Sequence, residues 1–459
     1  MAMNRPSVIS ADTLHRVVKM ALDTGEVHSL DEAYALFGRY RLSVSVDEVE
    51  AASPAGQAAL LTIVNCARRA LLGGVSVVGN LGVPLLLSLP GLGATVGSAV
   101  LTLGGSISEA LSGEVPALIL GEAPEGLSEL ALKVAYGGWR AGVFPADEDK
   151  TFDDEPRDVL AAMVAGALGV SEIFQNFRGN PMAARRRVGM NLWRPEVRDW
   201  DVSAPGPRGF VAPSHLWLIG LGHLGQAYLW ALGLLPYARP EEVELTLQDF
   251  DSLAASNDST SPLTNDALIG QRKTRAMAAW AELRGFRTRM IERRFAGDIV
   301  LQPDDPRVAL CGVDNAAARA ALEGAGFDLV VEAGLGAGPT EYLAMRLHSF
   351  PGSRPARDIW RDEGEAAATS TRHAPAYERL GEAGFDECGL VTLASRTVGA
   401  PFVGTVAAGL AIAEVLRRLN GVAGLDVLDL TLRDMNSREV VMASTELRGF
   451  NPGFTDLSS

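Results

Sequence analysis

Short apolar runs that end in glycine recur along the second half of the chain, and segments of helical character lie between several of them. The first, Leu216–Ile219, runs into the loop 220–225, and the residues from Gln226 to about Leu234 are typical of a helix. Further runs of this kind cover residues 307–311 and 329–334, and a similar run at 243–247 leads to Asp249 instead of glycine. A short apolar run bounded by glycine is typical of a buried parallel strand. The alternation of such strands with helices predicts an α/β fold with a mostly parallel sheet.

The loop after the first strand has a spacing suited to phosphate. Gly220, Gly222 and Gly225 form G-x-G-x-x-G, which lets the backbone turn tightly and approach an anion at the start of the following helix. Asp249 ends the next strand, at about the distance where a dinucleotide-binding fold places its ribose-binding acid. These features alone would suit a Rossmann domain for NAD or FAD equally well.

Polar residues further along narrow the class of ligand. Asn257 lies eight residues after Asp249, and Lys273 lies sixteen residues beyond Asn257, at the start of a predicted helix. Asp314 follows the strand 307–311, so we expect it to face the ligand crevice. There Asp314 could hold Mg²⁺ against triphosphate oxygens, while Lys273 offers a positive charge to the same phosphates. A dehydrogenase needs neither group, so the pattern favours ATP with Mg²⁺.

From about Leu216 to Gly421 the sequence resembles the adenylation domain of the ThiF/MoeB superfamily, which includes the ubiquitin-activating enzymes. The family motifs occur here in order as the glycine loop, Asp249-x-Asp251, Ser256-Asn257, Ile269-Gly270-x-x-Lys273 and Asp314-Asn315-x-x-x-Arg319. The resemblance implies adenylation of the C-terminal glycine of a ubiquitin-like or sulfur-carrier protein. In that activity Asp249 would bind ribose, Asn257 and Lys273 the phosphates, and Asp314 the magnesium. We expect Arg319 to support the fold around Asp314.

One position departs from the family pattern. The family follows its Ser-Asn pair with an arginine that neutralises phosphate charge, and Thr260 stands in its place here. Adenylyl transfer depends on neutralising the charge that develops on pyrophosphate, so another arginine must serve or the activity is weakened. Arg68 and Arg69 are the first candidates, and we assign Arg69 to this role. The basic cluster 185–187 is a second candidate.

Three cysteines, Cys66, Cys311 and Cys388, indicate reduced thiols and a cytoplasmic protein. No C-x-x-C occurs, so the structural zinc site of many sulfur-carrier relatives is absent. Cys311 lies in a predicted buried strand and Cys66 in an apolar helix, which favours packing roles. Cys388 lies in a polar segment that we expect to be an exposed loop, residues 348–397, before an apolar helix that ends at Leu419. In the ubiquitin-type branch of the family a cysteine at this place receives the activated glycine as a thioester, so we assign Cys388 as the nucleophile.

The first 200 residues predict a degenerate copy of the later domain. We expect a helical segment at 1–54, an inactive adenylation-like domain at 55–200, a linker at 201–213 and the active domain at 214–459, which ends in a hairpin. Val75–Gly79 is expected to be a strand that runs into a glycine turn and Ala117–Gly121 another, and neither an acid nor a lysine follows the Val75 strand at the required spacing. Residues 70–108 carry no charge, but repeated Gly and Pro favour a buried core over a membrane span. By the resemblance, the two halves would pack as a pseudo-dimer within one chain, unless the chain forms a homodimer.

A net charge of −15 argues against a nucleic-acid partner. Three functions remain open. The first is an activating enzyme for a ubiquitin-like protein, with transfer through Cys388 to a conjugating enzyme. For this function, the protein resembles the activating enzymes of bacterial ubiquitin-like (Bil-type) conjugation operons, some of which have antiphage roles. The second is a sulfur-carrier adenylyltransferase. The third is of another class, either a nicotinamide-dependent oxidoreductase or a nucleotide-binding scaffold without turnover.

Overall fold

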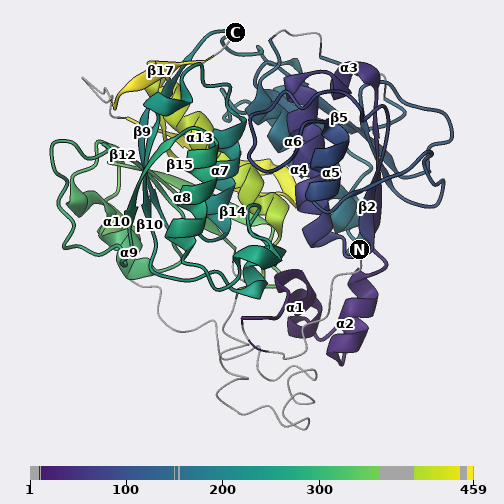
Figure 1. Cartoon of the computed structure of the whole chain (residues 1–459), viewed down its shortest axis with the longest axis horizontal. Coiled ribbons are helices and arrows are strands. Elements are labelled where there is room, and N and C mark those ends of the chain that lie inside the picture. The colour runs from purple at the N-terminus through teal and green to yellow at the C-terminus, as the bar shows by residue number, and fades with distance from the viewer. Residues whose placement is uncertain are drawn as a thin grey trace.

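Two sheets, one from each half of the chain, lie on either side of a central layer of helices in the computed structural model (Figure 1). The structure describes residues 10, 12–148, 150–152, 156–336, 338–360, 397–444 and 452–457. Two short helices, α1 (Arg16–Asp23) and α2 (Leu30–Phe37), precede the first sheet. They lie at the lower edge of the molecule in this view.

The N-terminal sheet has seven strands in the order β3-β2-β1-β4-β5-β6-β7. The first five in this order are parallel, and β6 and β7 are antiparallel to their neighbours. The strands are β1 (Arg41–Val46), β2 (Gly74–Val78), β3 (Ser106–Ile107), β4 (Ala117–Leu120), β5 (Ala131–Gly137), β6 (Arg140–Pro145) and β7 (Val188–Asn191). The helices are α3 (Glu48–Ala51), α4 (Pro54–Ala70), α5 (Val96–Thr102) and α6 (Val159–Phe177).

The C-terminal sheet has eight strands in the order β11-β10-β9-β12-β13-β14-β15-β16. Again the first five are parallel, and the rest are antiparallel. The strands are β9 (His215–Ile219), β10 (Glu244–Gln248), β11 (Arg287–Ile291), β12 (Val308–Cys311), β13 (Leu329–Leu335), β14 (Ala344–Phe350), β15 (Leu425–Thr431) and β16 (Asp434–Met442). The helices are α7 (His223–Leu234), α8 (Lys273–Leu283), α9 (Ala316–Ala320), α10 (Ala356–Ile359) and α13 (Pro401–Leu419). Short 3-10 turns η1–η5 cover Trp200–Val202, Pro240–Glu242, Ala255–Ser259, Asp266–Leu268 and Leu322–Ala325, and β8 (Val211–Pro213) pairs with β17 (Phe454–Asp456).

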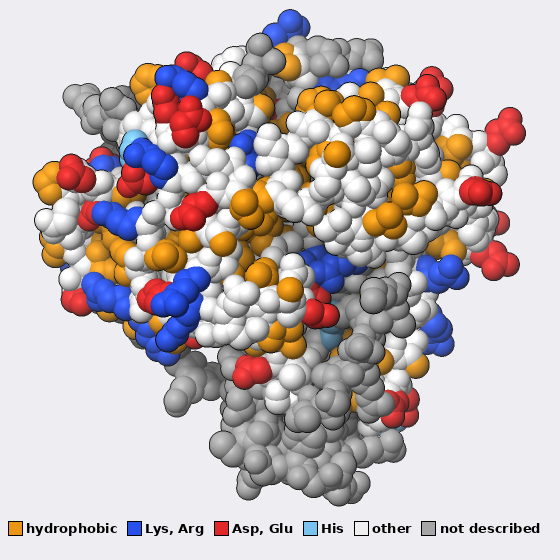
Figure 2. Space-filling model, in the orientation of Figure 1, with side chains coloured by type: hydrophobic (Ala, Val, Ile, Leu, Met, Phe, Trp, Pro, Cys, Tyr) orange, Lys and Arg blue, Asp and Glu red, His pale blue; other side chains and the backbone are white. Residues whose placement is uncertain are grey.

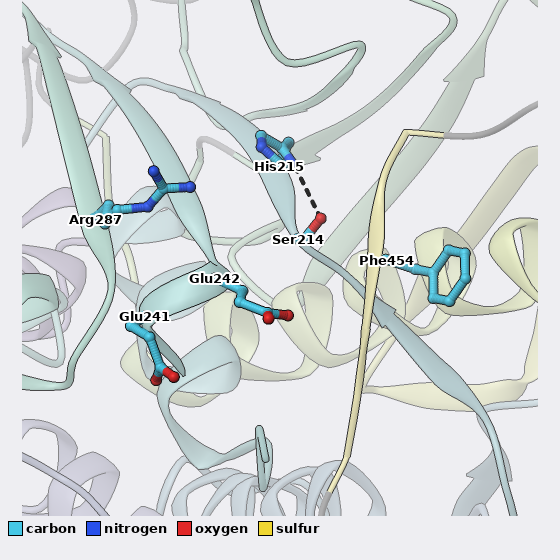
Figure 3. Close-up of a pocket in the computed structure, with 6 residues that line it drawn as sticks. All are labelled: Ser214, His215, Glu241, Glu242, Arg287 and Phe454. Atoms are coloured by element: carbon cyan, nitrogen blue, oxygen red, sulfur yellow. Dashed lines mark hydrogen bonds between the residues drawn. The ribbon is translucent and has the colours of Figure 1, made fainter. Parts of the chain in front are cut away.

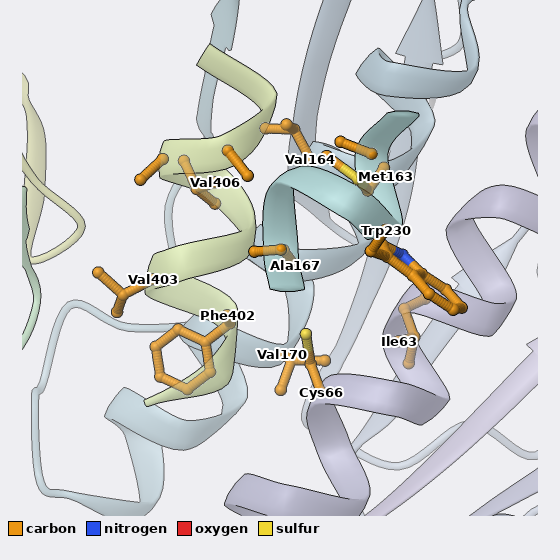
Figure 4. Close-up of a cluster of buried hydrophobic side chains, with 14 of the residues drawn as sticks. Ile63, Cys66, Met163, Val164, Ala167, Val170, Trp230, Phe402, Val403 and Val406 are labelled. Carbon is orange, nitrogen blue, oxygen red and sulfur yellow. The ribbon is translucent and has the colours of Figure 1, made fainter. Parts of the chain in front are cut away.

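The shared strand order shows that the two halves repeat one architecture. In each half one helix follows the first strand (α4 after β1, α7 after β9), and a long helix precedes the seventh (α6 before β7, α13 before β15). These four helices meet between the sheets, where α13 packs on both α6 and α7, and α6 packs on α4 (Figure 4). The prediction of an α/β fold with mostly parallel sheets and a second, amino-terminal half of the same kind is therefore confirmed, and the halves pack within one chain.

Several local expectations differ from the structure. Residues 1–54 were expected to be helical, yet β1 lies among them at the centre of the N-terminal sheet. The predicted run at Val75 forms β2, the second strand of that half, and β1 is the counterpart of β9. The expected exposed loop 348–397 begins inside β14, where His348 is buried. The expected linker 201–213 ends in a short strand.

The helix α6 is long and apolar enough to cross a membrane by composition alone. Of its most apolar window, 94% is buried inside the protein. It is covered by α4 and α13, as expected of a helix in a protein core.

Candidate functional site

The glycine loop connects β9 to α7 at the carboxyl edge of the C-terminal sheet. Gly220 has φ +86°, which favours glycine, and a Cβ on Gly225 would lie 2.0 Å from the carbonyl oxygen of Gly220. Around Gly222 a Cβ would meet nothing within 4 Å, and this residue begins α7 without a side-chain cap. The loop therefore brings its backbone close together while leaving the start of a twelve-residue helix open, which suits an anion.

Asp249 and Lys273 lie together beneath this loop. Asp249 Oδ2 accepts a hydrogen bond from the Leu221 amide at 2.7 Å, and Lys273 Nζ lies 3.9 Å from the same oxygen. Lys273 Nζ also donates to Asp251 Oδ2 at 3.1 Å. The lysine side chain is only 10% exposed, so its charge is held at the crevice by two carboxylates. Lys273 begins α8, as expected.

Asn257 lies in η3 and is held by a turn of its own. Its side-chain oxygen accepts a hydrogen bond from the Ala254 amide at 2.9 Å. An amide side chain that accepts through its oxygen keeps its nitrogen as the donor end. Asn257 can therefore offer N–H groups to an anion.

Asp314 is exposed and follows β12 at the same edge of the sheet. A Cβ on Gly220 would lie 2.8 Å from Val313 Cγ1, so the segment that carries Asp314 packs against the glycine loop. Arg319 Nε donates to the Val313 carbonyl at 2.8 Å and lies 3.2 Å from Glu332 Oε1. The expectation that Arg319 supports the fold around Asp314 is therefore confirmed.

A magnesium ion would have few protein ligands here. Among the described residues, no three His, Cys, Asp or Glu side chains gather in a way that could hold a metal. Mg²⁺ commonly keeps its waters and binds one or two carboxylates together with substrate phosphates, and the exposed Asp314 fits that pattern.

Arginines from the N-terminal half reach the segment that follows Asn257. Arg69 donates to the carbonyls of Pro262 at 3.2 Å and Thr264 at 2.9 Å, and its side chain is 2% exposed. Arg68 forms two hydrogen bonds with Asp258, at 2.9 Å and 2.5 Å. These contacts make Arg69 a residue that holds this loop, and they do not support the expected contact with phosphate.

A further arginine, which the sequence did not single out, approaches from α1. The Arg16 guanidinium donates to Ser256 Oγ at 3.3 Å, and the Arg16 amide donates to Ser259 Oγ at 3.2 Å. Arg186, from the other basic cluster, instead pairs with Glu172 at 2.8 Å and donates to the Arg433 carbonyl. The only sequence signal for Arg16 would have been its place in a short helix, because its contacts lie some 240 residues away.

Cys388 lies outside the described residues. Cys66 and Cys311 are buried, and burial raises the pKa of these thiols to about 11 and about 12, respectively. Both are therefore neutral packing residues near neutral pH, as expected.

In the N-terminal half a side chain occupies the corresponding place. Asp47 follows β1 as Gly220 follows β9, and its carboxylate accepts from the Glu50 and Glu122 amides, both at 2.8 Å. A Cβ on Gly121 would lie 1.9 Å from Asp47 Oδ2. Amides that could bind phosphate are thus already bonded to a carboxylate of the protein, which gives a physical reason for the expected loss of ligand.

A cavity of about 460 Å³ lies at the opposite, amino end of the C-terminal strands (Figure 3). It is lined by Ser214, His215, Glu241, Glu242, Arg287 and Phe454. None of these residues was predicted as part of the site, and the cavity is separate from the glycine loop.

The chain consists of two Rossmann-type halves, and one of them keeps a glycine loop with a paired acid and lysine. This combination defines an E1-like protein, that is, one similar to the ubiquitin-activating enzymes. The comparisons agree with this class. Residues 41–192 match the BilD N-terminal domain and residues 212–422 match the BilD C-terminal domain. The bacterial E1-like protein BilD of Collimonas sp. (strain OK412) is 45% identical over 414 residues, 89% of each chain. The chain therefore belongs to the BilD family of bacterial E1-like proteins, and the resemblance found in the sequence is confirmed.

Solved structures of lower similarity were also found. E. coli MccB covers 68% of this chain and 93% of its own, with 12% identity and a TM-score of 0.33. E. coli tRNA N6-threonylcarbamoyladenosine dehydratase, TcdA, covers 45% and 85%, with 16% identity and a TM-score of 0.28.

Proposed function

We propose that this protein uses ATP and Mg²⁺ to adenylate the C-terminal glycine of a ubiquitin-like protein. The observation that carries the proposal is the Lys273 cation, held by Asp249 and Asp251 beside an open glycine loop. A fixed ammonium at a helix N-terminus suits a triphosphate, whose charge is much larger than that of a dinucleotide. The family membership supports the same choice.

In this reaction a carboxylate oxygen of the terminal glycine attacks the α-phosphorus of ATP. The bond from that phosphorus to the bridging oxygen of the β-phosphate breaks, and pyrophosphate leaves. Lys273 and Asn257 would bind the phosphates and Asp249 the ribose. Asp314 would hold Mg²⁺, which neutralises charge on the leaving group.

Arg16 would supply the positive charge that the family's arginine provides at the position of Thr260. Its guanidinium contacts Ser256, the neighbour of Asn257, whereas Arg69 is committed to backbone carbonyls. An N-terminal helix would then complete the site of the C-terminal half, and Arg16→Ala would slow adenylation.

The second step rests on the family resemblance. The Cys388 thiolate would attack the acyl carbon of the adenylate, AMP would leave, and the resulting thioester would pass to a conjugating enzyme. We propose the cytoplasm as the compartment of this protein, because forming the thioester requires a reduced cysteine thiol.

Adenylation is tested by ATP–pyrophosphate exchange with the purified chain and a small ubiquitin-like protein that ends in glycine. Lys273→Ala and Asp314→Ala should each lower the exchange rate by about 10² or more, since each removes charge stabilisation from the transition state. Wild-type exchange in both variants would overturn the proposed site.

Transfer is tested by intact mass and a non-reducing gel, with Cys388→Ala beside the wild type. An adduct that needs ATP and Cys388 and is lost on reduction supports the thioester. AMP formation without an adduct would favour an adenylyltransferase of the sulfur-carrier type. Nucleotide binding without either product would favour a scaffold.

A further inference from the structure

The segment 256–264, here called the phosphate loop, belongs to the C-terminal half but is held by the N-terminal half. Three side chains from the last two turns of α4 contact it. Arg68 bonds twice to Asp258, Arg69 bonds to the carbonyls of Pro262 and Thr264, and Asn65 Nδ2 donates to the Pro262 carbonyl at 3.2 Å. One helix therefore fixes both the start and the end of the loop.

The charges in this cluster depend on one another. Burial alone would raise the pKa of Asp258, but the hydrogen bond from Arg68 and the nearby charge of Arg69 hold it below its ordinary value. Burial lowers the pKa of Arg69 to about 9, and the charge of Arg68 acts in the same direction. Two guanidiniums on consecutive residues thus interact with the carboxylate of Asp258. Without this carboxylate, two neighbouring positive charges would be left uncompensated.

Asp258 directly follows Asn257 in η3. The backbone of Asn257 is fixed on both sides: its amide donates to Ala254, and its carbonyl accepts from Thr260 and Ser261, at 2.9, 3.1 and 2.8 Å. These bonds join residues 254–261 into one turn that contains both Asn257 and Asp258, so a displacement of Asp258 shifts the turn that carries the Asn257 side-chain amide. We infer that the Arg68–Asp258 pair is a positioning device, by which the N-terminal half sets the place of Asn257 against the nucleotide phosphates. The inference rests on the proposed function for its activity readout.

The competing explanation is that Arg68 contacts the phosphate directly. The two explanations predict different nucleotide affinities for Asp258→Ala. If Arg68 acts directly, Asp258→Ala frees the guanidinium, and nucleotide binding stays the same or tightens. If the pair positions Asn257, Asp258→Ala and Arg68→Ala weaken binding alike. A displacement of about 1 Å can cost on the order of 10²-fold in an active site.

The test measures the Kd of a fluorescent ATP analogue and the KM for ATP in pyrophosphate exchange, on the full chain. Asp258→Ala, Arg68→Ala and the double variant should each raise both constants by about tenfold or more. The double variant should be no worse than the single ones, since residues in contact are not additive. Exchanging the two residues, Arg68→Asp with Asp258→Arg, should recover most of the affinity. Arg68→Lys keeps the charge without the paired hydrogen bonds and should recover only part.

Arg186→Ala is the matched control. It removes an ion pair within the N-terminal half, Arg186 with Glu172, together with the hydrogen bond from Arg186 to the Arg433 carbonyl of the C-terminal half, away from the phosphate loop. It should lower the melting temperature without changing the Kd. Equal loss of affinity in this control, or tight binding by Asp258→Ala, would overturn the inference, as would a wild-type chain that binds no nucleotide. A wild type that binds but shows no exchange would instead count against the proposed function, and the Kd values would still decide on the pair.

Discussion

Gly225 shows how a single missing side chain shapes the glycine loop. The first turn of α7 approaches the end of β9 so closely that a Cβ on Gly225 would lie 2.0 Å from the Gly220 carbonyl oxygen. The neighbour is backbone, which cannot rotate out of the way. The third glycine of the motif is thus required by packing, whereas the space around Gly222 is open.

Gly225→Ala is expected to destabilise the chain by about 1–3 kcal/mol through overpacking, and to weaken nucleotide binding by distorting the loop. Gly113→Ala is the control, because a Cβ there meets nothing within 4 Å and its backbone φ is not positive. Thermal unfolding and the Kd of an ATP analogue measure both effects. A Gly225→Ala protein as stable as the control would contradict the contact.

The buried side chain of His15 predicts that the stability of the fold depends on pH. Burial is the main cause that lowers its pKa from 6.5 to about 4, and its Nδ1 accepts a hydrogen bond from the Val17 amide at the start of α1. As pH falls through 6.5 the unfolded chain binds a proton that native His15 does not accept until about pH 4. The stability linked to this residue is therefore present above pH 6.5 and lost on acidification.

His15→Asn should keep the helix cap, since asparagine accepts the same amide, and should remove that loss. At pH 5 the variant should lose about 1–2 kcal/mol less than the wild type, relative to pH 7.5. Chemical denaturation at the two pH values measures the difference. Parallel curves would show that His15 does not carry the pH dependence.

At the scale of elements, the sequence predicted strands of the C-terminal half from their short apolar runs. The strands β9, β10, β12 and β13 lie close to their predicted places. The strand β1 was missed because it directly follows the short helices α1 and α2 and was included in one helical segment with them. The alternation of its apolar residues with Ser43 and Ser45 is typical of a strand, although both serines are buried here. The role of the phosphate loop was missed for another reason: its partners on α4 and α1 lie in the other half, and no local pattern reports a contact over some 190 residues.

The packing of α13 on α6 was not visible in the sequence either. A Cβ on Gly409 would lie 2.4 Å from Val164 Cγ2, and Val164 is fully buried. Glycine on one helix and valine on the other therefore let the two halves approach.

Gly409→Ala should cost about 1–3 kcal/mol by overpacking this contact. Val164→Ala removes Cγ2, the methyl group that the new Cβ would meet. The double variant should therefore lose less than the sum of the single losses, with a coupling of about 0.5–3 kcal/mol. Thermal unfolding of the three variants measures the coupling. Strict additivity would show that the two helices do not meet at this point.

For the whole molecule, the duplicated architecture raises the question of why one half alone would bind nucleotide. Both halves keep the same strand order, and both present a first helix at the carboxyl edge of the sheet. They differ in the groups at that edge. The C-terminal half has an open glycine loop with Lys273, and the N-terminal half has Asp47 bonded to the amides of Glu50 and Glu122.

We therefore expect one nucleotide per chain. Isothermal titration of the full chain with ATP and Mg²⁺ should give a stoichiometry near one, and Lys273→Ala should abolish the binding. Asp47→Ala removes the carboxylate from the N-terminal half but supplies no cation there, so it should lower stability by about 0.5–2 kcal/mol through the lost cap and leave the stoichiometry at one. Two sites in the wild type would contradict the assignment of an inactive half. A second site that appears only in Asp47→Ala would instead show that this carboxylate alone keeps nucleotide out, with the architecture of the N-terminal half still competent to bind it.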